Sequence, residues 1–237
     1  MLRVLSSDFL KIRHTAIWFL ICLGPIGVIS MQAANFTLRY DYLMHEYAAD
    51  LWGGLILNVS SLMVPALLMG LTIIASMIAN IEHQTNAWKQ VIALPVTKLT
   101  VISSKFGVTV LLLLVSSTLV AIGTLVLGLA LGMQASDIPY RQLLTMNYYP
   151  YLAAMPFIAL QVWLSITIKN QAIPLTIGIV GLVISLFAMV LADWVPWKWP
   201  YLQNEWNEPM YSVAAGLALG MLLYIIGLLS FVRRDVT

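Results

Sequence analysis

Six long apolar runs dominate this sequence and determine the solvent in which it can fold. An α-helix needs about 20 apolar residues to cross a bilayer, and these runs alternate too weakly to be barrel strands. They predict spanning helices at 15–33, 53–80, 103–133, 149–168, 172–192 and 212–232. With 61% hydrophobic and only 9% charged residues among 237, a soluble globule could not hide this apolar surface. We therefore expect an all-α polytopic membrane protein with six transmembrane helices, forming one domain over residues 1–237.

The basic residues predict the orientation of these helices, because Lys and Arg concentrate in cytoplasmic loops. With both termini in the cytoplasm, the predicted inner segments hold nine basic residues: Arg3, Lys11, Arg13, Lys89, Lys98, Lys105, Lys169, Arg233 and Arg234. The outer segments then hold three, Arg39, Arg141 and Lys198, which together with the nine account for all 12 Lys and Arg. The asymmetry predicts that both termini are cytoplasmic.

The first 13 residues have the periodicity of a short amphipathic helix. Leu2, Leu5, Phe9 and Ile12 share one face, while Arg3, Ser7, Asp8 and Lys11 lie elsewhere. A basic amphipathic helix tends to lie in the plane of the membrane interface. The segment 1–13 is therefore predicted to be an interfacial helix, and a plain topology anchor is the alternative.

A polar segment interrupts the apolar chain between the second and third runs. It reads NIEHQTNAWKQVIALPVTKLTVISSKF over residues 80–106. Its pattern predicts a short helix at 82–94 lying across the cytoplasmic face, which Pro95 would end because the residue before proline avoids the α region. Thr97 or Thr100 could then cap the next spanning helix. A short helix tied to two long ones would act as a lever.

Several kinds of chemistry are missing from the sequence. Proton-driven pumps and voltage sensors require charged residues near the centre of their membrane spans. No predicted span of this sequence has one there. There is no phosphate-binding loop, no serine-hydrolase elbow and no HExxH zinc motif, and the three histidines are dispersed. We therefore expect no catalytic residue, no metal site and no nucleic-acid partner. If the protein moves a substrate uphill, the energy comes from another chain.

Small and polar residues inside the spans have two interpretations. Gly54, Asn58, Ser61 and Pro65 share a face of the second span, where Pro65 should kink the helix. The sequence GLALG occurs at 128–132 and at 216–220, and glycines four apart allow close helix packing. Packing is the main interpretation for these faces. A pathway lining is the alternative, with Asn58, Ser61 and Gln161 as its candidates.

Aromatic residues gather in the outer loops, especially in DWVPWKWPYLQNEWNEPMY at 193–211. Tyr and Trp favour the membrane–water boundary, so an interfacial belt explains most of them. The alternative is that 194–206 forms a cap over a pathway between subunits. The candidates for this outer cap are Trp194, Trp197, Trp199 and Trp206.

One family resembles this sequence in both layout and motif. The polar segment matches a loose pattern of that family through Glu82, Trp88, Lys89, Leu94, Pro95, Val96, Thr97, Lys98, Lys105 and Phe106. The opening SSDFLKIRHTAIW, residues 6–18, is also similar to the start of those proteins. The chain thus resembles type 2 ABC transporter permeases, and among them most closely the lantibiotic-immunity and bacitracin-resistance permeases.

The resemblance implies a transport subunit of the bacterial cytoplasmic membrane and not an enzyme. ATP and Mg would be bound by two separate cytoplasmic ABC ATPase subunits, and a second permease subunit, identical or homologous, would complete the pathway. The implied function is export or expulsion of a hydrophobic or amphipathic compound, with an antimicrobial peptide as one candidate. The implied ATPase-coupling residues are Glu82, Gln84, Asn86, Trp88 and Lys89, with Trp88 as the apolar anchor and a plain surface loop as the alternative.

Two other functions remain open: a non-transporting scaffold or sensor that binds a ligand at its aromatic outer face, and a secondary transporter.

Overall fold

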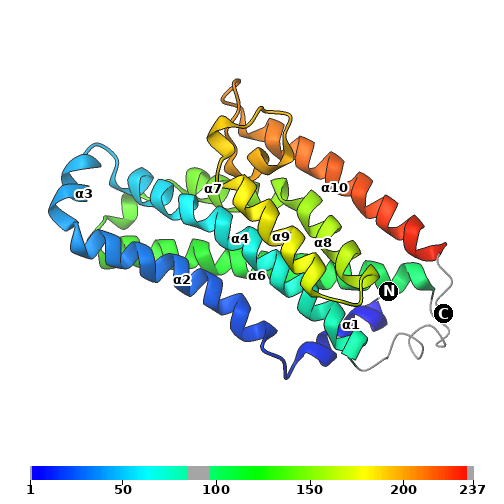
Figure 1. Ribbon diagram of the computed structural model, residues 1–237. Coiled ribbons are helices and arrows are strands. Elements are labelled where there is room, and N and C mark those ends of the chain that lie inside the picture. The colour runs from blue at the N-terminus through cyan, green and yellow to red at the C-terminus, as the bar shows by residue number, and fades with distance from the viewer. Residues whose placement is uncertain (1, 85–96, 234–237) are drawn as a thin grey trace.

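The computed structural model describes residues 2–84 and 97–233, and within these ranges every regular element is a helix (Figure 1). The α-helices are α1 (Leu2–Ile12), α2 (Ile17–Leu38), α3 (Tyr40–Glu46), α4 (Leu51–Gln84), α6 (Lys98–Ala130), α7 (Tyr140–Ala153), α8 (Met155–Thr167), α9 (Ala172–Ser185) and α10 (Pro209–Val232). Three short 3₁₀ turns are η1 (Ala135–Asp137), η2 (Ala188–Val190) and η3 (Pro196–Tyr201). The all-α prediction is confirmed for this part of the chain.

Five helical stretches in the described residues are long and apolar enough to cross a membrane. They are α2, α4, α6, the combined stretch Tyr140–Thr167, and α10. The predicted span 172–192 is wrong in length, because α9 has 14 residues and ends at Ser185. Such a helix is about 21 Å long, well short of a hydrocarbon core of about 30 Å. The Ser185 hydroxyl donates to the Leu182 carbonyl, a local bond that competes with helix continuation, and the chain turns into η2.

The predicted span 149–168 is also corrected, since it begins inside one helix and ends in another. α7 and α8 meet at Ala154, with Pro150 before the break and Pro156 in the first turn of α8. Proline has no N–H to continue the backbone ladder but fits the first turn of a helix. The candidate span Tyr140–Thr167 is therefore made of two helices that join at Ala154.

α4 forms the centre of the bundle. It packs against α2, α6, α7, α8 and α9, and most of its residues are buried. The core around it includes Leu68, Leu71 and Ile78 of α4 together with Leu112 of α6 and Ile158 of α8. α4 and α6 have 34 and 33 residues, so both are longer than the membrane core requires.

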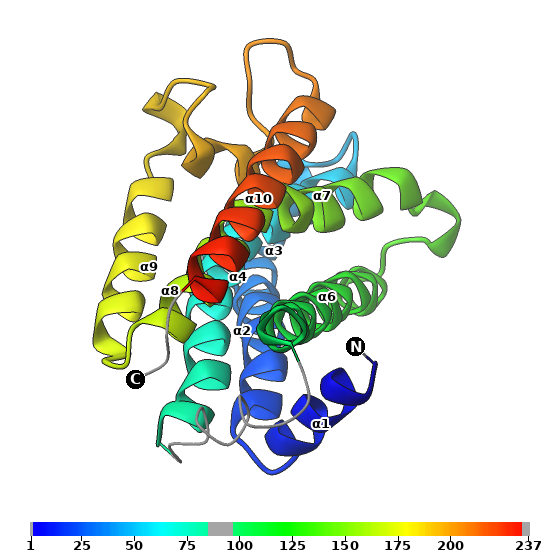
Figure 2. The same cartoon turned by 90° about the vertical axis from the view of Figure 1, so that its right-hand side faces the viewer.

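One end of the bundle gathers both ends of the described chain. α1, the end of α4, the start of α6 and the end of α10 lie there, as Figures 1 and 2 show. The Lys98 ammonium donates to the Val232 carbonyl at 3.5 Å, which joins α6 to α10 at this end. We call this the inner end and the opposite one, with α3, η1 and η3, the outer end. α1 lies across the inner end with Leu5, Phe9 and Ile12 packed on the core.

The two GLALG sequences have different structural roles. Gly216 and Gly220 let α10 approach the α7–α8 junction so closely that a Cβ on Gly216 would lie 2.6 Å from the Ala153 carbonyl oxygen. This confirms the predicted packing face at 216–220. Gly128 likewise leaves room for the Trp52 ring, but Gly132 lies beyond the end of α6 with a φ of +85°. The prediction for Gly132 is therefore wrong, because this glycine supplies a left-handed turn after the helix.

Candidate coupling site

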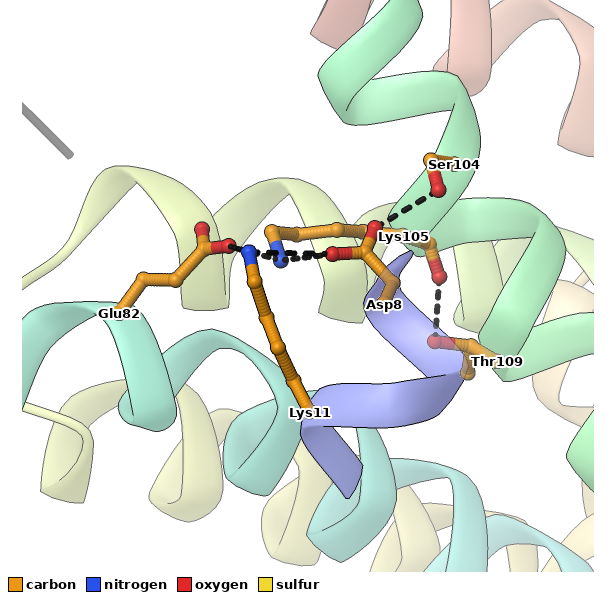
Figure 3. Close-up of polar contacts among 6 residues, drawn as sticks. All are labelled: Asp8, Lys11, Glu82, Ser104, Lys105 and Thr109. Atoms are coloured by element: carbon orange, nitrogen blue, oxygen red, sulfur yellow. Dashed lines mark hydrogen bonds and ion pairs between the residues drawn. The ribbon is translucent and has the colours of Figure 1, made fainter. Parts of the chain in front are cut away.

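Four charged side chains from three helices meet at the inner end (Figure 3). Glu82 comes from the last turns of α4, Lys105 from the first turns of α6, and Asp8 and Lys11 from α1. The Glu82 Oε1 lies 2.8 Å from the Lys105 Nζ and 2.9 Å from the Lys11 Nζ. The Asp8 Oδ1 lies 3.4 Å from the Lys11 Nζ and 3.7 Å from the Lys105 Nζ. We call these four residues the inner ion cluster.

The inner ion cluster is almost sealed from solvent. Glu82, Lys105 and Asp8 are only 1%, 2% and 4% exposed, whereas Lys11 reaches the surface. Two carboxylates face two ammonium groups, so their formal charges cancel. Removing one partner from such a buried set leaves an uncompensated charge, which is strongly destabilising. The cluster therefore ties α1, α4 and α6 into one unit.

Hydrogen bonds add to the ion pairs of the cluster, although the Glu82 Oε2 is buried without a partner. The Ser104 hydroxyl donates to the Asp8 Oδ2 at 2.7 Å, so Asp8 contacts α6 through two neighbouring side chains. For Lys11, burial alone would lower the pKa. The hydrogen bond to Glu82 and the charges of Glu82 and Asp8 outweigh burial, so the pKa of Lys11 is raised above its ordinary value of 10.5. Lys11 is therefore charged at neutral pH.

The predicted coupling residues fall into three groups. Glu82 is buried in the inner ion cluster, where a docked protein would not touch it in this conformation. Gln84 is exposed at the end of α4. Asn86, Trp88 and Lys89 lie in 85–96, outside the described residues, so their docking role stays a prediction. Thr97 is confirmed as the cap of α6, since its hydroxyl accepts from the Thr100 backbone N–H.

A second polar junction lies beside the cluster, on the next residue of α4. The His83 Nε2 donates to the Ser165 carbonyl oxygen of α8 at 3.0 Å. Gln171, just before α9, donates to the same carbonyl at 2.9 Å and accepts from the Ser76 hydroxyl at 2.9 Å. The end of α4 is thus bonded to α1 and α6 through Glu82, and to the α8–α9 connection through His83 and Ser76.

The three candidate pathway residues do not form one polar lining. The Asn58 side chain donates to the Tyr47 hydroxyl and the Gly54 carbonyl, and its backbone accepts from Gln32 of α2. Ser61 is exposed, and its hydroxyl donates to the Asn58 carbonyl. Gln161 is 3% exposed and donates to the Pro174 carbonyl of α9 at 2.9 Å. Each therefore has a local structural bond, and the pathway role stays a prediction.

The four tryptophans of the predicted outer cap divide into two pairs. Trp194 and Trp206 are 74% and 61% exposed, and Trp206 stacks on Tyr211. Trp199 is buried and donates to the Asp193 carbonyl at 2.8 Å, while Trp197 packs against Phe157 of α8. Only the second pair enters the bundle, so the turn η3 anchors the loop that carries the first pair.

Asp193 organises this outer loop. Its Oδ1 lies 2.7 Å from the Lys198 Nζ, and its Oδ2 accepts from the Glu205 backbone N–H at 2.8 Å. The hydrogen bond from Lys198, followed by that from Glu205, holds the pKa of Asp193 below its usual value. The loop is therefore closed by a charged carboxylate at neutral pH.

A multi-span helical bundle with a charged, buried junction at one end suits a membrane transport component. The family model described as "ABC-2 family transporter protein" matches residues 4–185, more than half of the chain. The chain belongs to the ABC-2 transporter family. No curated protein and no solved structure matches it. The ABC-2 match covers α1 through α9 and so includes both polar junctions.

Membership of the ABC-2 family has direct consequences. This multi-pass membrane protein is a transport component that is not itself catalytic, and its family implies association with an ATPase subunit. Within the described residues, no group of three or more His, Cys, Asp and Glu could hold a metal ion. The inner ion cluster is a junction of α1, α4 and α6.

Proposed function

We propose that this chain is the permease subunit of an ATP-driven exporter in the bacterial cytoplasmic membrane. It moves or expels a hydrophobic or amphipathic compound, with an antimicrobial peptide (lantibiotic immunity) as one candidate substrate. Two cytoplasmic ABC ATPase subunits, which bind ATP and Mg, supply the energy, and a second permease subunit, identical or homologous, completes the pathway. The inner end faces the cytoplasm.

The inner ion cluster is the observation that supports this proposal most directly. Residues 85–96 join α4 to α6, and the cluster ties these two helices together where that segment begins and ends. A force applied to the segment by the ATPase reaches Glu82 and Lys105 first. Because the cluster also binds α1, the three helices respond together.

Docking and force transmission can be tested separately. Trp88→Ala should prevent co-purification of the ATPase subunit, because an aromatic anchor contributes much of the affinity of an interface. Lys105→Gln should leave co-purification intact but abolish the stimulation of ATP hydrolysis by added substrate. If Trp88→Ala leaves both the complex and the stimulation unchanged, docking through this segment is wrong.

A charge exchange controls for general damage at the cluster. Asp8→Lys, Lys11→Glu, Glu82→Lys and Lys105→Glu together invert every charge of the cluster and keep an opposite charge in each ion pair. This fourfold variant should recover part of the stimulation that Lys105→Glu alone removes. Equal loss in the single and fourfold variants would contradict the transmission role.

One alternative function has its own supporting observation. Trp194 and Trp206 are exposed at the outer end, as expected of a scaffold or sensor that binds a ligand on its aromatic face. Reconstitution with the ATPase decides between the sensor and the exporter. A sensor would bind its ligand without any change in ATP hydrolysis, whereas the exporter couples the two.

A further inference from the structure

A narrow crevice enters the bundle between α4, α8, α9 and the turn η3. Its walls are mainly apolar and include Leu71, Phe157, Leu160 and Ile177. Three further side chains, those of Thr72, Gln161 and Trp197, bring polar groups to it. We call this the outer crevice. It brings together Gln161, which is predicted to line a pathway, and Trp197, which is predicted to form the outer cap.

The indole N–H of Trp197 is buried without a hydrogen-bond partner. Its Nε1 lies against Gly181 of α9, 2.8 Å from where a Cβ on that glycine would be. Among the described residues, Trp163 shares this feature, whereas Trp52 donates to the Gln134 carbonyl at 3.0 Å and Trp199 to the Asp193 carbonyl at 2.8 Å. A buried donor without an acceptor is costly, so the position is suited to a ligand that supplies one.

The surroundings of Trp197 restrict that ligand. Gln161 is oriented by its bond to the Pro174 carbonyl, and the Thr72 hydroxyl already donates to the Leu68 carbonyl. The other lining residues offer mainly hydrocarbon or aromatic surface. Gly181 lies four residues before the end of α9, so the indole is near the outer end of the bundle. An apolar chain fits the walls, and a single acceptor oxygen at the head of that chain fits the indole. A charged group has no counter-charge among the residues that line the crevice.

We propose that the outer crevice binds an acyl chain that carries an ester or amide carbonyl, with the carbonyl oxygen accepting from the Trp197 Nε1. The ring turns slightly away from Gly181 to meet it. Both bilayer phospholipids and single-chain amphiphiles have this chemistry. The site is a property of this chain alone and does not depend on the proposed transport function.

A photolabelling experiment tests the site without any ATPase. The full-length permease is placed in nanodiscs of a diether phospholipid, which has no ester carbonyl. A diazirine-bearing methyl dodecanoate is compared with the matching methyl dodecyl ether, whose oxygen is a weaker hydrogen-bond acceptor than a carbonyl, and labelled peptides are identified by mass spectrometry. The ester should label peptides containing Phe157–Gln161 or Ile177–Gly181 with up to about fivefold higher affinity than the ether, since one full hydrogen bond contributes about that factor.

A matched pair of variants shows which donor is responsible. Trp197→Phe keeps an aromatic ring but removes the N–H, so the ester should fall to the affinity of the ether. Trp163→Phe is the control, because its indole N–H is also buried without a partner but lies in a different groove, between α8 and α10. It should leave the preference for the ester unchanged.

The outcomes separate cleanly. Replacing the diether lipid by a diacyl phospholipid identifies the source: reduced labelling means that bilayer lipid occupies the crevice, and unchanged labelling means that a free amphiphile does. Equal labelling by ester and ether in the unaltered protein overturns the proposal, and this comparison needs no variant. So does labelling that maps elsewhere, or a Trp197→Phe variant that still prefers the ester.

Discussion

The two ends of the bundle are held together by different chemistry. At the inner end, buried charges join helices that are far apart in the sequence, with Glu82 bound to Lys11 and to Lys105. At the outer end, the ion pair of Asp193 and Lys198 closes a single loop, while the helices themselves are joined by close backbone approach and aromatic packing. Charges therefore connect elements at one end and only shape a loop at the other.

This difference has a mechanical meaning. A helix joint made by apolar packing can shift in small steps, but a buried ion pair has only a few acceptable arrangements, because each charge must keep a partner. The inner end is thus suited to transmit a displacement between α1, α4 and α6 as a unit. The outer end can adjust its packing around a ligand.

The largest expected effect comes from breaking the inner ion cluster. Lys105→Met leaves Glu82 and Asp8 with Lys11 as their remaining partner in the cluster. We expect the free energy of unfolding to fall by about 3–5 kcal/mol, the usual result of removing one member of a buried pair. Urea unfolding in detergent micelles measures it.

The matched control for Lys105→Met is Lys198→Met at the outer end. Because its ion pair lies within one loop, this change should cost much less and should leave the midpoint of the main unfolding transition nearly unchanged. Equal losses for both variants would contradict the distinction between the two ends.

The second prediction concerns the close approach that joins the outer half of the bundle. Gly216→Ala places a methyl group 2.6 Å from the Ala153 carbonyl oxygen, so α10 must move away from the α7–α8 junction. Overpacking of this kind should reduce the free energy of unfolding by about 1–3 kcal/mol, again measured by urea unfolding. Gly27→Ala is the control, since a Cβ there meets nothing within 4 Å and the change should be neutral or slightly stabilising.

The sequence predicted most of the helices but not the cluster that joins them. Apolar runs locate α2, α4, α6 and α10 because lipid requires long hydrophobic helices. Near the ends of such runs, however, the sequence predicts Glu82 as an ATPase-coupling residue and Lys105 only as a mark of the cytoplasmic side. Which of them pair depends on how α1 folds across the inner end, and contacts between residues so distant in sequence have no local pattern.

A signal for the cluster was nevertheless present in the helical periodicity. The assignment of Asp8 to the polar side of the first helix is wrong. Asp8 lies three residues after Leu5 and four before Ile12, and such positions share one side of a helix. Similarly, Glu82 continues the buried positions Ile78 and Ala79 of α4. A charge that interrupts an apolar face must find an opposite charge, and this could have indicated a buried pair. The length of α9 had no comparable signal, since residues beyond Ser185 remain apolar.

The third prediction tests how the inner end begins α6. Thr97→Ala removes the side-chain acceptor of the Thr100 N–H and should lower the free energy of unfolding by about 1 kcal/mol. Thr37→Ala on α2 is the control, because its exposed hydroxyl only donates to the Ala33 carbonyl within its own helix. A loss at Thr37 as large as that at Thr97 would show that the measurement does not detect capping.

The smallest expected effect is at the outer loop and depends on pH. The Lys198 ammonium and the Glu205 N–H lower the pKa of Asp193 from its usual 3.8, so the charged carboxylate favours the closed loop. A carboxylate whose pKa is lowered in the folded protein stabilises the closed loop fully above its ordinary pKa. That stabilisation is lost as the pH falls through the lowered pKa of the folded state. The loop should therefore resist protease at pH 7 and become more susceptible below about pH 3.8.

Limited proteolysis with pepsin over pH 2–5, normalised to an unrelated exposed site, measures this change in susceptibility. In Asp193→Asn the dependence should disappear and the loop should be cut at a uniformly higher rate, whereas Asp137→Asn should leave the profile of the unaltered protein. An identical profile in Asp193→Asn would mean that aromatic packing of η3 alone closes the outer end, and that charge has no part there.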